Sequence, residues 1–431
     1  PLGIPILSKF MCSVGMLRRV NFYSICFAFG LSVLLILAGS RYADNTYYRP
    51  SIESRRNVRN FLKVEYGEET YTQHIPTVPY DGSPDIKKLL EKTRSKIKYQ
   101  LSKYNFSESG AHLLEDLVME SGGRPLQSLI ISTWRSGTTF LGELLNAIPG
   151  TYYHYEPLLK YGIIQIRGPP EADQALSTIR AMLKCNYEGL EDYFKYGSKH
   201  WNQFSHNTRL WDHCKYKKAL CCDAEFTSRL CKLFPFQTMK VVRLRLRLIQ
   251  EILDDKEFNV KVLLLVRDPR GVMQSRQHRD FCQPAPDCWE PSLVCADMIS
   301  DYVAAGRIQQ QYPDRLMVLR YEELALKPNI TTHRILKFLR LSATQSIDEF
   351  LQSHTNVEVA GVSSTFRVSR EVPFRWKNAL NFNYVDEIQV CVHYFINLQN
   401  MSVDTFDTLV SHVLTRHFMQ TMIFIFLYSL Q

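Results

Sequence analysis

The sequence predicts an α/β domain with a central parallel sheet flanked by helices, extending from about residue 126 to residue 398. Three short runs carry this prediction: residues 127–133, "VKVLLLV" at 260–266 and "RLMVLRY" at 315–321. Each run is mainly apolar and bounded by polar residues, and helical patterns such as that of 138–148 separate them. Strands that are apolar on both faces are typical of a parallel sheet covered by helices on both sides.

The N-terminal part predicts a membrane anchor. Residues 20–39 contain no charged side chain, and twenty residues at about 1.5 Å each can cross a hydrocarbon layer of about 30 Å. A cleaved signal peptide is the alternative, but its apolar region is normally shorter, and no clear small-x-small site follows before Arg41. We therefore expect an uncleaved signal-anchor, with residues 1–19 as a cytoplasmic tail.

Residues 40–125 are expected to form a stem and N-terminal helices. Residues 41–84 are polar and rich in tyrosine and proline, as in a linker. The spacing of apolar residues predicts an amphipathic helix over residues 84–104. A second helix is expected from Ser109 to about Ser121. The sequence pattern of the tail at residues 399–431 does not indicate a function.

Cysteines and charge indicate the compartment and the partners. Nine of the eleven cysteines follow the anchor, together with acceptor triplets for N-glycosylation at Asn105, Asn329 and Asn400. These features suit an oxidising lumen, and the absence of paired two-residue cysteine spacing favours disulfides over zinc. The formal charge of +9 favours anionic partners. It is spread along the chain without a dense basic tail, so nucleic acid is not expected.

The stretch "LIISTWRSGTTF" at 129–140 predicts an anion site. A strand, a tight loop and a helix start direct free backbone N–H groups toward one place, as in a P-loop. Gly137 allows the backbone to approach a ligand, and Arg135 replaces the lysine of the Walker pattern. An arginine favours bidentate contact with phosphate or sulfonate oxygens. The candidate ligand-binding residues are Arg135, Ser136, Gly137, Thr138, Thr139 and Phe140.

A second candidate cluster follows the run at 260–266. Arg267 lies at the predicted carboxyl end of this strand, and Ser275 lies on the helix that Pro269 helps to start. Asp268 is expected to cap this helix. Elsewhere, Lys240 and its neighbour Arg243 either approach a ligand or belong to an amphipathic strand with one wet face.

Together the two stretches resemble the sulfotransferase superfamily. "RSGTTF" at 135–140 is similar to its loop for the 5′-phosphosulfate of 3′-phosphoadenosine 5′-phosphosulfate, and Arg267 with Ser275 matches its pair for the 3′-phosphate. "LVRDPRGVMQSR" at 265–276 resembles the Golgi carbohydrate sulfotransferases that modify the 6-hydroxyl of galactose, N-acetylgalactosamine or N-acetylglucosamine. "YEPL", "LRYEEL" and "WKNAL" extend the resemblance over about residues 128–391.

The resemblance implies a single-pass type II enzyme of the Golgi membrane, with its catalytic domain in the lumen. It implies 3′-phosphoadenosine 5′-phosphosulfate as co-substrate, a glycan or glycoprotein as acceptor, and no metal. The N-acetylglucosamine 6-O-sulfotransferase type is favoured. The expected catalytic residues are Arg135 and Glu156, the latter as the base of the matching motif, with His154 as the alternative base. In an extended segment these two would project from one face, and partial burial would raise the pKa of Glu156 to a useful range.

Two other functions remain open at this point. A P-loop kinase or nucleotidase would require a lysine and a metal-binding carboxylate that the loop pattern lacks. A catalytically silent, membrane-anchored glycan-binding protein would bind sugar without the donor. A homodimer also remains open.

Overall fold

A computed structural model gives the structure of residues 86–361 and 364–389. The predicted anchor, the linker and the tail at 399–431 lie outside these residues, as does the C-terminal end of the predicted domain at residue 398. No helix within the described ranges is long and apolar enough to cross a membrane. The domain limits, the signal-anchor and the orientation of the chain therefore stay predictions.

A five-stranded parallel sheet lies at the centre of the fold, in the order β2-β3-β1-β4-β5. The predicted parallel sheet and its three predicted strands are confirmed, and two further strands complete it. The register aligns Ile131 of β1 with Val241 of β3 and with Leu264 of β4. The strands are β1 Leu126–Ile131, β2 Thr151–Tyr155, β3 Phe236–Val241, β4 Val260–Val266 and β5 Leu316–Arg320.

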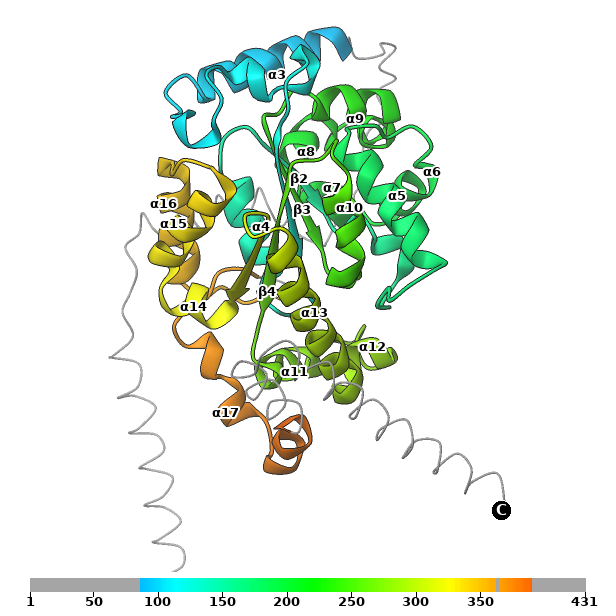
Figure 1. Ribbon diagram of the computed structural model, residues 1–431, viewed down its shortest axis with the longest axis vertical. Coiled ribbons are helices and arrows are strands. Elements are labelled where there is room, and N and C mark those ends of the chain that lie inside the picture. Colours follow the sequence, from blue (N-terminus) through cyan, green and yellow to red (C-terminus); the bar gives the residue numbers. More distant parts are fainter. Residues whose placement is uncertain (1–85, 362–363, 390–431) are drawn as a thin grey trace, which may run out of the picture. The chain divides into compact units, whose positions relative to one another are not determined.

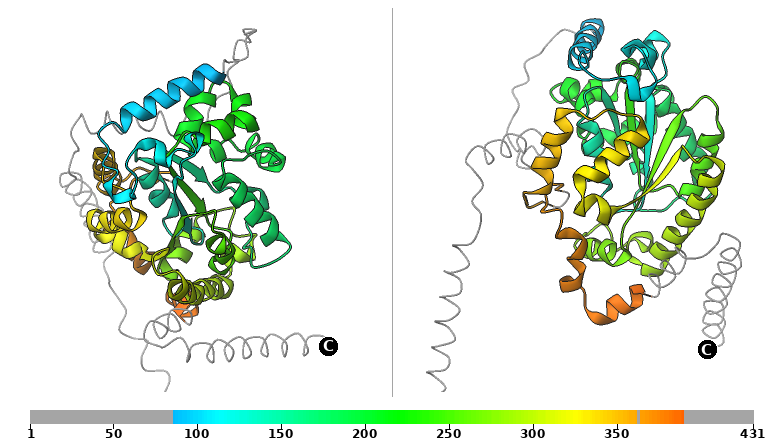
Figure 2. Two further views of the ribbon diagram at one scale, coloured as in Figure 1. Left: turned by 45° about the horizontal axis from the view of Figure 1, so that its top comes forward. Right: turned by 60° about the vertical axis from the view of Figure 1, so that its left-hand side comes forward.

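Helices cover both faces of the sheet. Figures 1 and 2 show α14, α15 and α16 on one side and the long helix α13 on the other. The helices are α3 Ile86–Gln100, α4 Thr138–Asn146, α5 Glu171–Leu183, α6 Glu191–Gly197, α7 Asn202–Ser205, α8 Thr208–Cys214, α9 Ala224–Cys231, α10 Gln250–Asp254, α11 Pro269–Gln277, α12 Pro286–Trp289, α13 Pro291–Gln311, α14 Tyr321–Leu326, α15 Pro328–Leu339, α16 Gln345–Thr355 and α17 Trp376–Ala379. Apolar residues on both faces of the strands are thereby removed from water, which supplies the main stabilisation of such a sheet.

Two helices were predicted in the segment before the sheet; one is confirmed and one is wrong. The amphipathic helix is confirmed as α3, which buries Leu90 and Ile97. The second predicted helix, from Ser109 to Ser121, is wrong, because the chain there forms short 3₁₀ turns. The Asp116 carboxylate accepts hydrogen bonds from the backbone N–H groups of the two residues at 112–113, which favours a turn over a continuous helix.

Three disulfides join described cysteines, so the predicted disulfides are confirmed. They are Cys185–Cys231, Cys214–Cys221 and Cys282–Cys288. The last of these joins the turn after α11 to Cys288 of α12. This part of the fold lies at the carboxyl end of β4, where the candidate site is built.

Candidate active site

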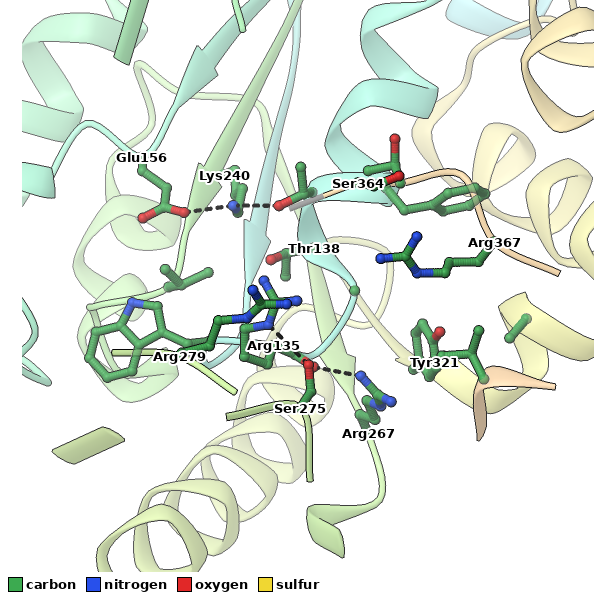
Figure 3. A pocket seen from close by; sticks show the side chains of 18 of the residues that line it. Arg135, Thr138, Glu156, Lys240, Arg267, Ser275, Arg279, Tyr321, Ser364 and Arg367 are labelled. Atoms are coloured by element: carbon green, nitrogen blue, oxygen red, sulfur yellow. Dashed lines mark hydrogen bonds and ion pairs between the residues drawn. The ribbon is translucent and has the colours of Figure 1, made fainter. Parts of the chain in front are cut away.

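One cavity of about 490 Å³ opens at the carboxyl edge of the sheet. Figure 3 shows that its lining comes from the ends of several strands and from the helices that follow them. Carboxyl ends of parallel strands, with the N-termini of the following helices, form the usual ligand-binding edge of an α/β sheet. Most of the candidate residues meet there: Arg135, Gly137, Thr138, Thr139, Phe140, Glu156, Arg267 and Ser275 all line the cavity.

The loop between β1 and α4 has the geometry of an anion site. Gly137 has φ of 94°, and a Cβ atom there would lie 2.5 Å from the ring of Tyr321. Only glycine avoids both the backbone strain and this clash. Arg135 also lies in the left-handed region, with φ of 68°. The free backbone N–H groups at the start of α4 therefore face the cavity beside an arginine.

The two motifs separated in sequence meet in this loop. Arg135 donates from Nε to the Ser275 hydroxyl at 3.1 Å, and Arg267 donates from Nη1 to the Arg135 carbonyl at 2.8 Å. The Arg267 guanidinium also lies over the Tyr321 ring, 4.4 Å from its centroid. Asp268 caps α11 by accepting from the backbone N–H of Arg270, as predicted. The structure thus joins Arg135, Arg267 and Ser275 in one cluster.

Glu156 lies at the end of β2 and is held by two cations. Lys240 Nζ donates to its Oε1 at 2.6 Å, and Arg243 donates to its Oε2. Burial alone would raise the pKa of Glu156, but Lys240 and Arg243 outweigh it and lower the pKa to about 2. The expectation that burial raises this pKa is therefore wrong. Lys240 Nζ also donates to Thr139 of the anion loop at 2.9 Å, so it connects the loop to Glu156.

Two residues named from the sequence do not line the cavity. His154 is 4% exposed, contacts the Tyr187 hydroxyl at 3.1 Å through Nδ1, and has its pKa lowered to about 3 by burial. The prediction that His154 and Glu156 share a face is wrong, because β2 ends at Tyr155 and Glu156 turns away with φ of 41°. Ser136 is 1% exposed and is not among the residues that line the cavity.

Lys240 and Arg243 are fully inside the domain. Both are 3% exposed, and every residue of β3 is buried, so the alternative of an amphipathic strand with a wet face is wrong. The alternative that they approach a ligand fits their position, because both line the cavity.

The cavity is strongly cationic. Among its described lining residues Glu156 is the one carboxylate, against seven Lys or Arg side chains, namely Arg135, Lys240, Arg243, Arg267, Arg279, Arg367 and Arg375. Burial and the nearby charges of Arg279, Arg267 and Arg367 lower the pKa of Arg135 to about 10, which leaves it protonated at neutral pH. Such mutual repulsion favours the binding of an anion with several charges.

Sequence reasoning missed three of these cations. Arg279 lies four residues after Ser275, so a helix continued past Gln277 would have placed both on one face. In the structure α11 ends at Gln277, and Arg279 lines the cavity from the turn that follows. Arg367 and Arg375 belong to an irregular segment after α16, which carries no strand or helix signal that would place it at the sheet edge. Figure 3 shows Arg279 near Arg135 and Arg367 on the opposite side of the cavity.

Comparison with known sequences identifies the relatives of this chain. The family model of the sulfotransferase domain matches residues 125–402. Mouse carbohydrate sulfotransferase 4 is 24% identical over 319 residues, which cover 63% of this chain and 80% of that protein. Carbohydrate sulfotransferase 1 of Danio rerio is 25% identical over 342 residues, covering 66% of this chain and 80% of that protein.

Solved structures with a similar course of the chain include two sulfotransferase domains. The domain from the Synechococcus PCC 7002 olefin synthase has a TM-score of 0.36 at 18% identity and covers 62% of this chain and 94% of that domain. The domain from the curacin biosynthetic pathway has a TM-score of 0.33 at 16% identity, and the match covers 60% of this chain and 92% of that domain.

Proposed function

Because the chain belongs to the sulfotransferase domain family, we propose that it transfers a sulfonyl group from 3′-phosphoadenosine 5′-phosphosulfate to a hydroxyl group of a glycan. The observation that carries this proposal is the cluster of Arg135, Ser275 and Arg267 at the carboxyl edge of the sheet. The names of the curated relatives support a carbohydrate acceptor.

The described residues fit a donor with two separate anionic groups. Arg267 and Ser275 would hold the 3′-phosphate, and the Arg267 Nε atom supports this role because it is buried without a hydrogen-bond partner. The loop at 135–140 and Lys240 would hold the 5′-phosphosulfate through backbone N–H groups and a cation. A buried donor atom without a partner, on a side chain that lines a cationic cavity, is stabilised when a phosphate oxygen accepts from it.

Transfer requires the leaving phosphate to be neutralised and the acceptor hydroxyl to lose its proton. The donor supplies the sulfonyl group on a phosphate leaving group. Arg135 and Lys240 stabilise negative charge on the phosphate oxygens, and Glu156 accepts the hydroxyl proton. An anion at the loop competes with Glu156 for Lys240, because Lys240 contacts both Glu156 and Thr139. This competition raises the pKa of Glu156 above about 2, so the carboxylate becomes a better proton acceptor when the donor is bound.

The finer proposal concerns the acceptor and the location. We infer a 6-hydroxyl of N-acetylglucosamine, N-acetylgalactosamine or galactose as the acceptor group, on the resemblance of residues 265–276. A primary hydroxyl at the end of an exocyclic carbon can reach into a recessed cavity more easily than a ring hydroxyl. The uncharged run at 20–39 supports a signal-anchor in the Golgi membrane, with the domain in the lumen.

The experiment incubates the purified full-length protein with donor labelled in its sulfonyl group and with a panel of sugar acceptors. The products are separated, and the position of the sulfate is determined by mass spectrometry and NMR. The proposal predicts label on a glycan 6-hydroxyl. Label on another hydroxyl would overturn only the position. Absence of transfer to every acceptor, together with no rise of Tm on addition of 3′-phosphoadenosine 5′-phosphate, would overturn the proposed function.

A further inference from the structure

Arg276 follows Ser275 in sequence but points into the core. Its side chain is 0% exposed and makes four hydrogen bonds to three acceptors. Nη2 donates to the Thr133 hydroxyl at 2.7 Å and to the Trp134 carbonyl at 3.0 Å, and Nε donates to the same carbonyl at 3.3 Å. Nη1 donates to the Cys288 carbonyl at 2.8 Å. A buried guanidinium therefore connects α11, the anion loop and the loop closed by the Cys282–Cys288 disulfide.

The residues held in this way immediately precede Arg135. A second buried arginine, Arg245, donates from Nη2 to the Ser132 carbonyl at 3.0 Å, so backbone or side-chain oxygens of three consecutive residues, 132–134, accept from arginines beneath the loop. The next residue, Arg135, has the left-handed φ of 68°, which costs on the order of 1 kcal/mol or more for a residue other than glycine. This conformation persists only if the surrounding structure fixes it.

We propose that Arg276 is a positioning residue for the donor: it holds the Thr133 hydroxyl and the Trp134 carbonyl so that Arg135 presents its guanidinium to Ser275 and its carbonyl to Arg267. This inference rests on the proposed function, because it assigns Arg276 to the donor site. Arg276 itself does not line the cavity and touches no donor atom.

The shape of the side chain, rather than its charge alone, explains why this position is an arginine. A guanidinium is planar and directs several N–H groups along fixed directions, whereas a lysine ammonium is a single point of charge on a flexible stem. No ion pair within the described ranges joins Arg276 to a carboxylate, so its burial costs solvation energy that hydrogen bonds to the loop offset. Burial and the nearby charge of Arg245 lower the pKa of Arg276 to about 9, which leaves the group protonated at neutral pH.

The chain offers a matched control in Arg315. This half-buried arginine also donates to three backbone carbonyls, those of Val260, Leu253 and Phe258, at 3.1, 2.7 and 3.1 Å. It lies at the start of β4 and β5, whereas the loop follows the carboxyl end of β1. Substitution at Arg315 removes a comparable set of hydrogen bonds at the opposite edge of the sheet. It therefore separates a general loss of stability from a loss of loop geometry.

The experiment measures the Kd of 3′-phosphoadenosine 5′-phosphate by calorimetry for the full-length wild type, Arg276→Gln, Arg276→Lys and Arg315→Gln. Circular dichroism establishes the folded fraction of each protein. We expect both Arg276 variants to bind about tenfold to a hundredfold more weakly, by analogy with residues that orient the ligands of a metal ion, whose loss typically has an effect of this size. Arg315→Gln should change Kd by less than about threefold while lowering Tm.

The outcomes are distinct. If folded Arg276→Gln binds 3′-phosphoadenosine 5′-phosphate with the same Kd as the wild type, the positioning role is overturned. The proposed function is not affected by that result. Wild-type affinity in Arg276→Lys together with weak binding in Arg276→Gln would support the positioning role, but it would overturn the argument that the planar shape of the guanidinium is required. If both Arg276 variants fail to fold, Thr133→Val removes the side-chain acceptor of the same guanidinium. A raised Kd in this folded variant would support the inference, and an unchanged Kd would overturn the role given to Thr133 in it. Failure of the folded wild type to bind would overturn both the inference and the donor site.

Discussion

Glu156→Gln tests the ion-paired carboxylate of the cavity. Glutamine has almost the same shape as glutamate but cannot carry the negative charge that Lys240 and Arg243 contact. The change leaves two cations, each 3% exposed, without their common partner. Removing one partner from a buried ion pair is strongly destabilising, because the remaining charge is not solvated.

The magnitude follows from the pKa of Glu156. Its fall from 4.5 to about 2 corresponds to about 3 kcal/mol of folding free energy at neutral pH, at about 1.4 kcal/mol for each pKa unit. Because the pKa of this acid is lower in the folded protein, the contribution is present above pH 4.5 and is lost as the pH falls toward 2. About half of it should remain at pH 3.

Urea denaturation of the wild type and of Glu156→Gln measures the difference. We expect the variant to be less stable by about 3 kcal/mol at pH 7 and by about half as much at pH 3. Its turnover should be strongly reduced, whereas binding of 3′-phosphoadenosine 5′-phosphate should be equal or tighter, because Lys240 and Arg243 are released for the ligand. The matched control is Glu143→Gln, a buried glutamate of α4 that accepts from Thr365 and does not line the cavity.

Two results would refute this reasoning. A loss of stability below about 1 kcal/mol at pH 7 would mean that the ion pairs do not form as described. Normal turnover in Glu156→Gln would mean that Glu156 does not accept the hydroxyl proton, whatever the effect of the substitution on stability.

Further predictions concern three sites. Gly137→Ala should lower both Tm and donor affinity, since its Cβ would meet the Tyr321 ring, whereas Gly162→Ala, with φ of 71° and open space around the position, should lower only Tm. Arg279→Gln should weaken binding of 3′-phosphoadenosine 5′-phosphate and make the Kd depend less on salt concentration. An unchanged salt dependence of the Kd would mean that Arg279 does not contribute to the attraction of the anion. His154→Asn should keep turnover within about threefold and leave the pH profile unshifted between pH 5 and 8, because burial keeps His154 neutral there; a shifted profile would contradict this.

The sequence predicts the sheet and the donor motifs because these depend on local patterns. Apolar runs identify β1, β4 and β5, and the glycine and arginine of the loop predict an anion site before any contact is known. The meeting of Arg135 with Arg267 follows from the adjacency of β1 and β4, in which Ile131 pairs with Leu264. That adjacency is typical of the fold that the motifs indicate.

The state of Glu156 could not be predicted in the same way. Lys240 is 84 residues away in sequence, and the two side chains meet because β2 pairs with β3, with Tyr155 opposite Lys240. The sequence patterns did not predict β2 or β3, so neither their pairing nor the sign of this pKa shift could be inferred from the sequence. The error about His154 has a local cause, because extended geometry was assumed one residue past the end of β2.

The most direct test of the central claim is the binding of 3′-phosphoadenosine 5′-phosphate to the full-length protein, measured by calorimetry for the wild type and Arg267→Ala. We predict one site per chain and a Kd at least about tenfold higher in the variant, because the proposed contact of Arg267 with the 3′-phosphate is a charge-assisted hydrogen bond. No binding by the folded wild type, or equal binding by the variant, would contradict the assignment of this cavity to the donor.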